Sequence, residues 1–219
     1  MVSADAKILL GLAVLTALFS IPALDAAASA AFFAGGFSWD PHGLLEFARA
    51  AVPTMIVGSL VFFVLVWLMD ILSRGPSRDW IWDLTPRRIG YLVVTAAIGP
   101  GLIVESLLKP HWGRARPKDI ALFGGEHAYT PPFVVADECA RNCSFVSGHA
   151  AIAFWLTAYA FLLPREWRAA GLWASTGFGV LIGFVRVVQG GHFASDVLAA
   201  GLIVVAVNAG LARLMLGRA

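Results

Sequence analysis

Six apolar segments, separated by polar connections, constrain the fold of this 219-residue chain more than any other feature of its sequence. A helix needs about 20 apolar residues to cross the hydrocarbon core of a bilayer. The segments cover roughly residues 7–24, 51–72, 89–108, 149–164, 169–188 and 194–216. The fourth is short, and Pro100 predicts a kink in the third, which neighbouring helices can accommodate. We therefore expect one all-α domain over residues 1–219, a bundle of six transmembrane helices.

The composition supports a membrane protein and argues against a nucleic-acid partner. Hydrophobic residues make up 59% of the chain and charged residues only 14%, with a mean hydropathy of +0.78. A soluble domain carries about 25% charged residues and could not bury this much apolar surface at this size. The net charge of +2 and the lack of a long basic run exclude nucleic acid as an expected partner.

The basic residues predict how the chain crosses the membrane. With a cytoplasmic N-terminus, nine of the sixteen Lys and Arg residues fall in cytoplasmic connections. Of the other seven, six lie in or beside the connection between the third and fourth segments, where they can serve a site. This distribution favours a cytoplasmic N-terminus and an outward-facing connection. A cleaved signal peptide is the alternative for the first segment, because "AAASA" follows it at 26–30, but the connection would face the same side.

That connection of about 40 residues is long enough to be functional. It opens with "KPHWGRARP" at 109–117 and ends with "CSFVSGH" at 143–149. Lys109, Arg114, Arg116 and Lys118 fall within ten residues. Cations at this density repel one another unless water screens them or an anion neutralises them. The sequence therefore predicts an anion site here.

Three polar clusters should meet on the outer face of a six-helix bundle. They are Lys109 with Arg116, the run Ser147, Gly148 and His149, and Arg186 with His192 and Asp196. The cations and a helix N-terminus suit a phosphate group. His192 and Asp196 are four residues apart, so the carboxylate can hold a neutral, nucleophilic imidazole in one tautomer. His149 is placed to be a general acid.

Each of these residues also has a purely structural interpretation. A lone arginine at a membrane boundary is usually an anchor, and Ser147 with Gly148 can be a helix cap. Six ionisable groups on one membrane face are costly unless they serve a site, so the functional interpretation is favoured. We interpret His111, His127 and Arg114 as loop residues, with contact to a headgroup as the alternative. Glu105 can pair with a nearby cation and receives no further role.

The clusters resemble the motifs of the type 2 phosphatidic acid phosphatase (PAP2) superfamily, which also includes the vanadium haloperoxidases. Its first motif, Lys, six residues, Arg-Pro, matches Lys109 to Pro117. Its second, Pro-Ser-Gly-His, matches "VSGH", with Val146 in place of proline. Its third, Ser-Arg, five residues, His, three residues, Asp, matches "VRVVQGGHFASD", with Val185 in place of serine. The similarity covers about residues 89–205.

By this resemblance, His192 attacks phosphorus to form a phosphohistidine, Asp196 steadies it, and His149 protonates the leaving oxygen. The residues implied to hold the phosphoryl oxygens are Lys109, Arg116, Ser147, Gly148 and Arg186. No metal or other cofactor is expected. The missing proline would loosen the approach to the fourth segment, and the missing serine removes one hydrogen bond to the phosphate or its surroundings. We therefore expect reduced activity or an altered substrate fit, but an active enzyme.

A site at the outer membrane surface favours a lipid phosphate or pyrophosphate as substrate. Residues 23–41 and 139–149 are similar to bacterial members of the superfamily that dephosphorylate lipid A, which implies a bacterial inner-membrane protein with a periplasmic site. Undecaprenyl pyrophosphate and phosphatidylglycerolphosphate remain alternatives, as does a lipid phosphotransferase. A non-enzymatic binder of anionic lipid would not need His192 with Asp196, and the haloperoxidases are soluble.

Three further features of the sequence carry structural expectations. Cys139 and Cys143 lie in the outward connection, where the periplasm favours a disulfide over two free thiols. Zinc is disfavoured, because no second cysteine pair or spaced histidine pair completes its ligand set. The stretch "HGLLEFARA" at 42–50 predicts an interfacial helix, and we expect four tryptophans to anchor at the membrane surface. They are Trp39, Trp80, Trp82 and Trp167.

Overall fold

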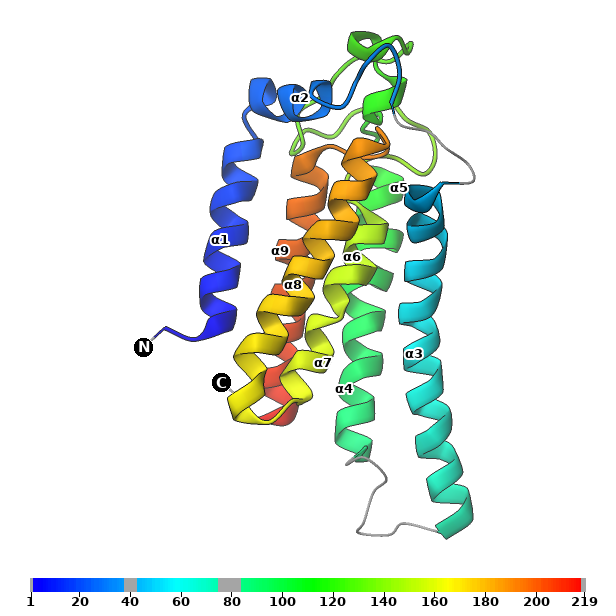
Figure 1. The fold of residues 1–219 in the computed structure, drawn as a ribbon, viewed down its shortest axis with the longest axis vertical. Coiled ribbons are helices and arrows are strands. Elements are labelled where there is room, and N and C mark those ends of the chain that lie inside the picture. The colour runs from blue at the N-terminus through cyan, green and yellow to red at the C-terminus, as the bar shows by residue number, and fades with distance from the viewer. Residues whose placement is uncertain (1, 38–42, 75–83, 218–219) are drawn as a thin grey trace.

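A computed structural model describes residues 2–37, 43–74 and 84–217 of the chain (Figure 1). Every regular element within these ranges is a helix, which confirms the all-α prediction, and one isolated β-bridge joins Ile120 to His127. The helices of 6 residues or more are α1 (Ala4–Phe19), α2 (Pro22–Ala30), α3 (Leu44–Arg74), α4 (Pro86–Ala96), the π-helix η2 (Ala97–Leu108), α6 (Gly148–Trp155), α7 (Thr157–Leu162), α8 (Arg165–Val188) and α9 (Ala194–Leu216). The short ones are α5 (Lys109–His111), η3 (Pro117–Asp119) and η4 (Ala121–Phe123).

Four helices in the described ranges are long and apolar enough to cross a membrane. They are Leu44–Ser73, Pro86–His111, Arg165–Val188 and Ala194–Leu216. Helices α1 and α2 pass the same test only as a pair, and they are bent by 91°. The predicted fourth segment forms a shorter apolar helix, Gly148–Leu162. The structure thus supports four of the six predicted spans by length and composition, or five when the bent pair is taken as one.

Pro100 changes the type of helix that the third predicted segment forms. Helix α4 gives way to the π-helix η2 at Ala97, and Pro100 lies inside η2. Proline has no N–H to donate and its ring crowds the preceding turn, so a regular α-helix cannot continue unchanged through it. The predicted kink therefore takes the form of wider turns, which lead directly into Lys109.

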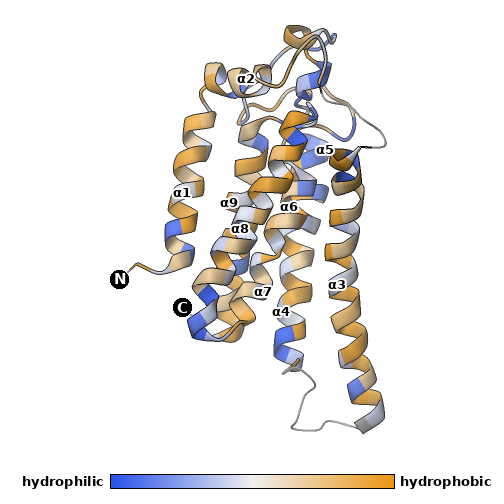
Figure 2. Ribbon diagram, viewed as in Figure 1, coloured by the Kyte–Doolittle hydropathy of each residue, from blue (hydrophilic) through white to orange (hydrophobic). Residues whose placement is uncertain are grey.

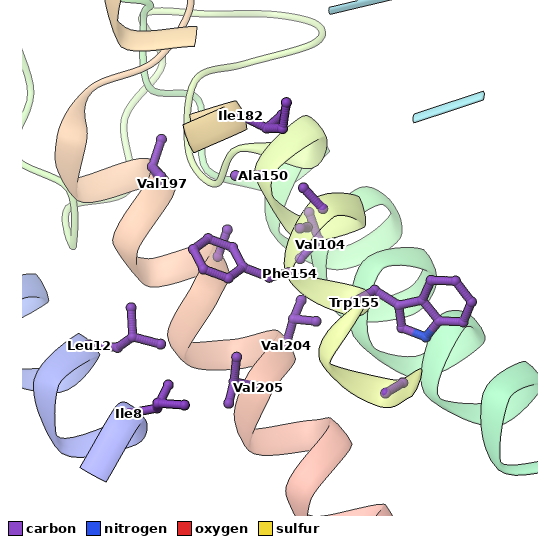
Figure 3. Packing of buried hydrophobic residues seen from close by; sticks show 14 of the residues in the cluster. Ile8, Leu12, Val104, Ala150, Phe154, Trp155, Ile182, Val197, Val204 and Val205 are labelled. Atoms are coloured by element: carbon purple, nitrogen blue, oxygen red, sulfur yellow. The ribbon is translucent and has the colours of Figure 1, made fainter. Parts of the chain in front are cut away.

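The bundle is organised around α9, which packs against α1, α4, α6 and α8. Phe154 of α6 lies beside α9 in this core, near Val204 (Figure 3). A Cβ atom at Gly179 or Gly201 would lie within 2.8 Å of the Phe154 ring, so these glycines let α8 and α9 approach α6 closely. The sequence encodes this packing by small residues at the helix contacts, as is common in membrane helices.

Hydrophobic residues cover the outside of the bundle along its length (Figure 2). Helix α3 exposes many of them, among them Met55, Phe62, Leu65 and Leu72. A soluble protein rarely shows so large an apolar surface, whereas lipid chains cover it without cost. Hydrophilic residues gather at the ends of the helices (Figure 2).

The predicted site clusters lie at one end of the bundle, where α5 ends and where α6 and α9 begin (Figure 1). Residues 112–147 and α2 cover this end (Figure 1). The predicted interfacial helix at 42–50 is not a separate element in its described part, because α3 runs without interruption from Leu44. Residue 42 lies outside the described residues. Trp39, Trp80 and Trp82 lie outside the described residues, and Trp167 is exposed in the first turn of α8.

Candidate active site

His192 lies in the turn between α8 and α9, with only 1% of its surface exposed. Gly190, at a φ of 62°, and Gly191 precede it and allow this tight turn. Its Nδ1 atom is 2.7 Å from the carbonyl oxygen of Ser144. Because a carbonyl oxygen can only accept, Nδ1 carries the ring proton and donates a hydrogen bond to the Ser144 carbonyl. The other ring nitrogen, Nε2, is left with a free lone pair.

Asp196 acts on His192 less directly than the sequence predicted. Its Oδ2 is 3.8 Å from His192 Nδ1, which is too long for a hydrogen bond. Oδ2 instead accepts hydrogen bonds from Ser144 Oγ at 2.5 Å and from the Phe193 N–H at 2.9 Å. The sequence predicted that this carboxylate holds the imidazole in one tautomer; in the structure the Ser144 carbonyl accepts the hydrogen bond from the ring, and Asp196 holds Ser144.

Arg114, which we interpreted as a loop residue, is a completely buried part of this network. Its Nη1 donates to Asp196 Oδ1 at 2.5 Å, and its Nη2 donates to Asp25 Oδ2 at 2.7 Å. Burial acts to lower its pKa, but the two carboxylates outweigh this effect and hold the pKa above its usual value. Arg114 thus stays charged and compensates two buried acids.

Asp25 connects the N-terminal part of the chain to the same network. From α2, its carboxylate accepts hydrogen bonds from the N–H of Ser195 at 3.0 Å and from its hydroxyl at 2.7 Å. These contacts satisfy donors in the first turn of α9. The sequence contained one signal for this role. Asp25 directly follows the apolar segment 7–24, and an acid in such a position needs a specific partner when it is buried.

Burial lowers the pKa of His192 to about 4. Asp196 opposes this shift, whereas the positive charges of Arg186 and Arg116 add to it. The ring is therefore neutral at neutral pH, as a nucleophile must be. The unfolded chain binds this proton near pH 6.5, so the contribution of the neutral ring to stability is complete above pH 6.5 and is lost as the pH falls toward 4.

We expect histidine-selective NMR of the protein in detergent to show a His192 ring that titrates near pH 4. The signal would be identified by its absence from the His192→Asn variant. A midpoint at or above 6.5 would contradict the buried, neutral ring.

Cations line a cavity of about 170 Å³ beside this turn. Its lining residues are Arg49, Arg116, Lys118, Arg186, Gln189 and Gly191. No acidic side chain lines it within the described part of the chain. Two of the predicted phosphate ligands, Arg116 and Arg186, thus come together as expected. Arg49 and Gln189 were not predicted.

Neighbouring groups hold the cavity's arginines in place. Both Nε and Nη2 of Arg116 donate to the carbonyl oxygen of Asn142, at 3.1 and 2.7 Å. Asn142 lies between Cys139 and Cys143, whose sulfur atoms are bonded and whose Cα atoms are 5.6 Å apart. Arg49 comes from the first turns of α3, and its Nε donates to Glu46 Oε2 at 2.7 Å.

Lys109 and the start of α6 meet on another side of the site. Lys109 Nζ pairs with Glu105 Oε1 at 2.9 Å, so Glu105 has a nearby cation as its partner, as the sequence suggested. A Cβ atom on Gly148 would lie 2.0 Å from Glu105 Oε1 and 3.1 Å from Lys109 Nζ, so glycine lets this ion pair lie directly against the start of α6. Ser147 caps the helix through Oγ and the N–H of Ala150. His149 follows, half-buried.

Both departures from the motifs are buried apolar residues. Val146 is completely buried, and Val185 is 8% exposed. Neither supplies a polar group to the cavity. Among the described residues, no group of three or more His, Cys, Asp or Glu side chains is arranged to hold a metal ion.

Comparison with known families agrees with the arrangement of these motifs. The model of the PAP2 superfamily matches residues 89–218, which is more than half of the chain. The chain belongs to the PAP2 superfamily. Membership confirms the family predicted from the three motifs, and it supports a phosphatase.

Three curated relatives of this PAP2 protein are all called lipid A 4'-phosphatase. The one from Francisella tularensis subsp. novicida is 42% identical over 119 residues, 54% of this chain and 54% of the relative. The one from Rhizobium leguminosarum is 30% identical, covering 80% of this chain and 73% of the relative. The Rhizobium etli protein is 31% identical, covering 79% and 66%. The chain thus spans about half to three quarters of these relatives. No solved structure matches it.

Proposed function

We propose that this PAP2 protein is a membrane phosphatase that hydrolyses a phosphate ester or pyrophosphate on a lipid headgroup, with lipid A as the favoured substrate. The observation that carries this proposal is the position of His192. Its Nε2 lone pair is free because Nδ1 donates to Ser144, and the residue directly follows Gly191 of the cationic cavity. A nucleophile beside a phosphate-sized cluster of cations is suited to phosphoryl transfer.

In the first step, the Nε2 lone pair of His192 attacks phosphorus while the bond from phosphorus to the headgroup oxygen breaks. The leaving oxygen takes a proton from His149, at the start of α6, which the negative charge of the bound phosphate keeps protonated for this step. The product is a phosphohistidine. In the second step, water attacks phosphorus and gives a proton back to His149, the P–N bond breaks, and phosphate leaves with His192 restored.

Positive charge stabilises the transferring group in both steps. Arg116 and Arg186 face the cavity, Lys109 lies beside the first turn of α6, and the N–H groups following Ser147 point out of that helix. Such fixed donors stabilise the negative charge that spreads over the phosphoryl oxygens in the transition state. We therefore propose that the reaction needs no metal.

An apolar groove beside Glu105 supports a lipid substrate. It has a volume of about 230 Å³ and runs between α3, η2 and α6, lined by residues that include Leu60, Pro100 and Trp155. Because Glu105 also contacts Lys109, an acyl chain in this groove would place its headgroup near Lys109, one of the cations that we propose to bind the phosphate. The names of the three relatives favour lipid A among the lipids that fit. Undecaprenyl pyrophosphate and phosphatidylglycerolphosphate are the alternatives.

The proposal includes the topology predicted from the sequence. Six segments cross the bacterial inner membrane, the N-terminus is cytoplasmic, and the site faces the periplasm. The bonded pair Cys139 and Cys143 fits that compartment, since disulfides persist in the periplasm.

We expect the purified protein to release phosphate from lipid A in detergent with EDTA present, faster than from undecaprenyl pyrophosphate or phosphatidylglycerolphosphate. Product analysis with a second lipid as acceptor separates hydrolysis from phosphotransfer. Release that stops with EDTA and returns with a divalent cation would contradict the metal-free mechanism. Preference for another lipid would replace lipid A as the substrate.

A further inference from the structure

The third motif lacks the serine that its family places before the arginine, and the structure shows what stands near the gap. Val185 occupies the serine position and is buried. Gln189 lies one helical turn later, at the C-cap of α8, and its N–H donates to the Val185 carbonyl at 3.1 Å. A residue four positions along a helix lies on the same face. The Gln189 side chain can therefore lie on the helix face where a serine at position 185 would place its hydroxyl group.

Gln189 is only 4% exposed, and one of its two side-chain polar atoms has a hydrogen-bond partner. Its Oε1 accepts a hydrogen bond from Arg186 Nη1. Its Nε2 has no hydrogen-bond partner among the described residues, and neither does Arg186 Nε. Both residues line the cationic cavity. Buried donors without partners are uncommon and costly, so this pair indicates an acceptor that binds there.

The turn after Gln189 keeps Arg186 close to the cavity. A Cβ atom at Gly191 would lie 2.2 Å from Arg186 Nη2, so the guanidinium packs directly against this glycine. The acceptor that three arginines, a lysine and an amide would share is an anion with several oxygens. A phosphoryl group offers enough oxygens for all of them.

We propose that Gln189 is a phosphate-binding residue that replaces the missing serine. Oε1 orients the Arg186 guanidinium, and Nε2 donates to a non-bridging oxygen of the substrate phosphoryl group. The inference rests on the proposed phosphatase function and deepens it. It also explains how the site retains a neutral donor although Val185 has none.

Two substitutions separate phosphate binding from structural support of Arg186. Gln189→Leu removes both polar groups. Gln189→Glu keeps an oxygen for Arg186 but replaces the donor by a charged acceptor, which repels phosphate. We expect Gln189→Leu to weaken binding of inorganic phosphate and vanadate about tenfold, roughly the effect of one hydrogen bond to a charged group, and Gln189→Glu to weaken it further. Binding is measured by calorimetry and by inhibition, with KM and kcat for the lipid determined alongside.

A second-site change provides a rescue. Val185→Ser added to Gln189→Leu should restore a neutral donor and recover part of the phosphate affinity. Asn208→Leu, which removes another buried amide in α9, is the matched control and should leave phosphate affinity unchanged. If Gln189→Leu does not fold, Gln189→Glu carries the test, because it keeps the size and the Arg186 acceptor.

The outcomes distinguish the two proposals. Wild-type affinity in Gln189→Glu would show that the residue only supports Arg186, and this inference would be wrong while the phosphatase function stands. A wild-type protein that neither binds phosphate nor hydrolyses any of the three lipids would overturn the proposed function itself.

Discussion

Replacing His192 with asparagine is expected to lower kcat by roughly 10⁴-fold or more, which is the usual effect of losing a nucleophile. Asparagine keeps an amide donor that can reach the Ser144 carbonyl, so the turn should fold unchanged. It lacks the ring nitrogen whose lone pair would attack phosphorus. The loss should therefore appear in kcat and not as a failure to bind phosphate.

A trapped intermediate makes this experiment specific. Wild-type protein mixed with lipid labelled in its phosphate and quenched within one turnover should carry a label that is stable to alkali and labile to acid, as a phosphohistidine is. His192→Asn should carry none. His127→Asn, in an exposed loop, is the matched control and should label like wild type. Equal labelling of His192→Asn and wild type would place the nucleophile elsewhere, with His149 as the first candidate.

The sequence predicted those parts of the site whose residues lie close together along the chain. Three short motifs carry most of the predicted residues, and the apolar segments place all three at one end of the bundle. They are 109–117, 147–149 and 186–196. Their pattern needs no knowledge of tertiary contacts. The PAP2 family, the all-α fold and the proximity of Arg116 to Arg186 followed from it.

Residues that the sequence did not reveal act through contacts between distant parts of the chain. Asp25 and Arg114 are 89 positions apart and meet only because α2 turns across the end of the bundle. That turn follows Ser20, since Pro22 lacks an N–H and Ile21 before it adopts an extended backbone. The predicted first span, 7–24, ran through this point because its hydropathy does not change there.

Ser144 and Arg49 were missed for a related reason. The functional group of Ser144 toward His192 is its backbone carbonyl, which no side-chain pattern can indicate. Arg49 belongs to the first turns of α3, and only the packing of α3 beside the loops brings it to the cavity. In both cases the position of the backbone, and not the residue type, makes the contact.

Arg114→Leu is expected to be the most destabilising single substitution at the site. Removing one partner of a buried ion pair typically costs about 3–5 kcal/mol, because the remaining charge loses its compensation. Here two carboxylates, Asp25 and Asp196, would be left without their common cation. Thermal unfolding in detergent should shift to a clearly lower temperature, and kcat should fall because Asp196 holds Ser144, which orients His192.

Restoring the charge balance tests this cause. Asp25→Asn introduced with Arg114→Leu removes one of the two uncompensated acids, so the double variant should be more stable than Arg114→Leu alone. Arg165→Leu, on the exposed start of α8, is the control for loss of an arginine and should change the unfolding temperature little. Stability of Arg114→Leu equal to that of Arg165→Leu would contradict the buried network.

The pattern of recovery would also separate stability from catalysis. Arg114 binds Asp196 Oδ1, and only Oδ2 of Asp196 bonds to Ser144. Asp25→Asn can therefore relieve the excess charge without replacing the donor that fixes Asp196. We expect the double variant to regain much of its unfolding temperature but little of its kcat. Without Arg114 on Oδ1, the Asp196 carboxylate can still rotate and move Oδ2 away from Ser144. Recovery of both together would mean that Arg114 affects the reaction only by keeping the protein folded.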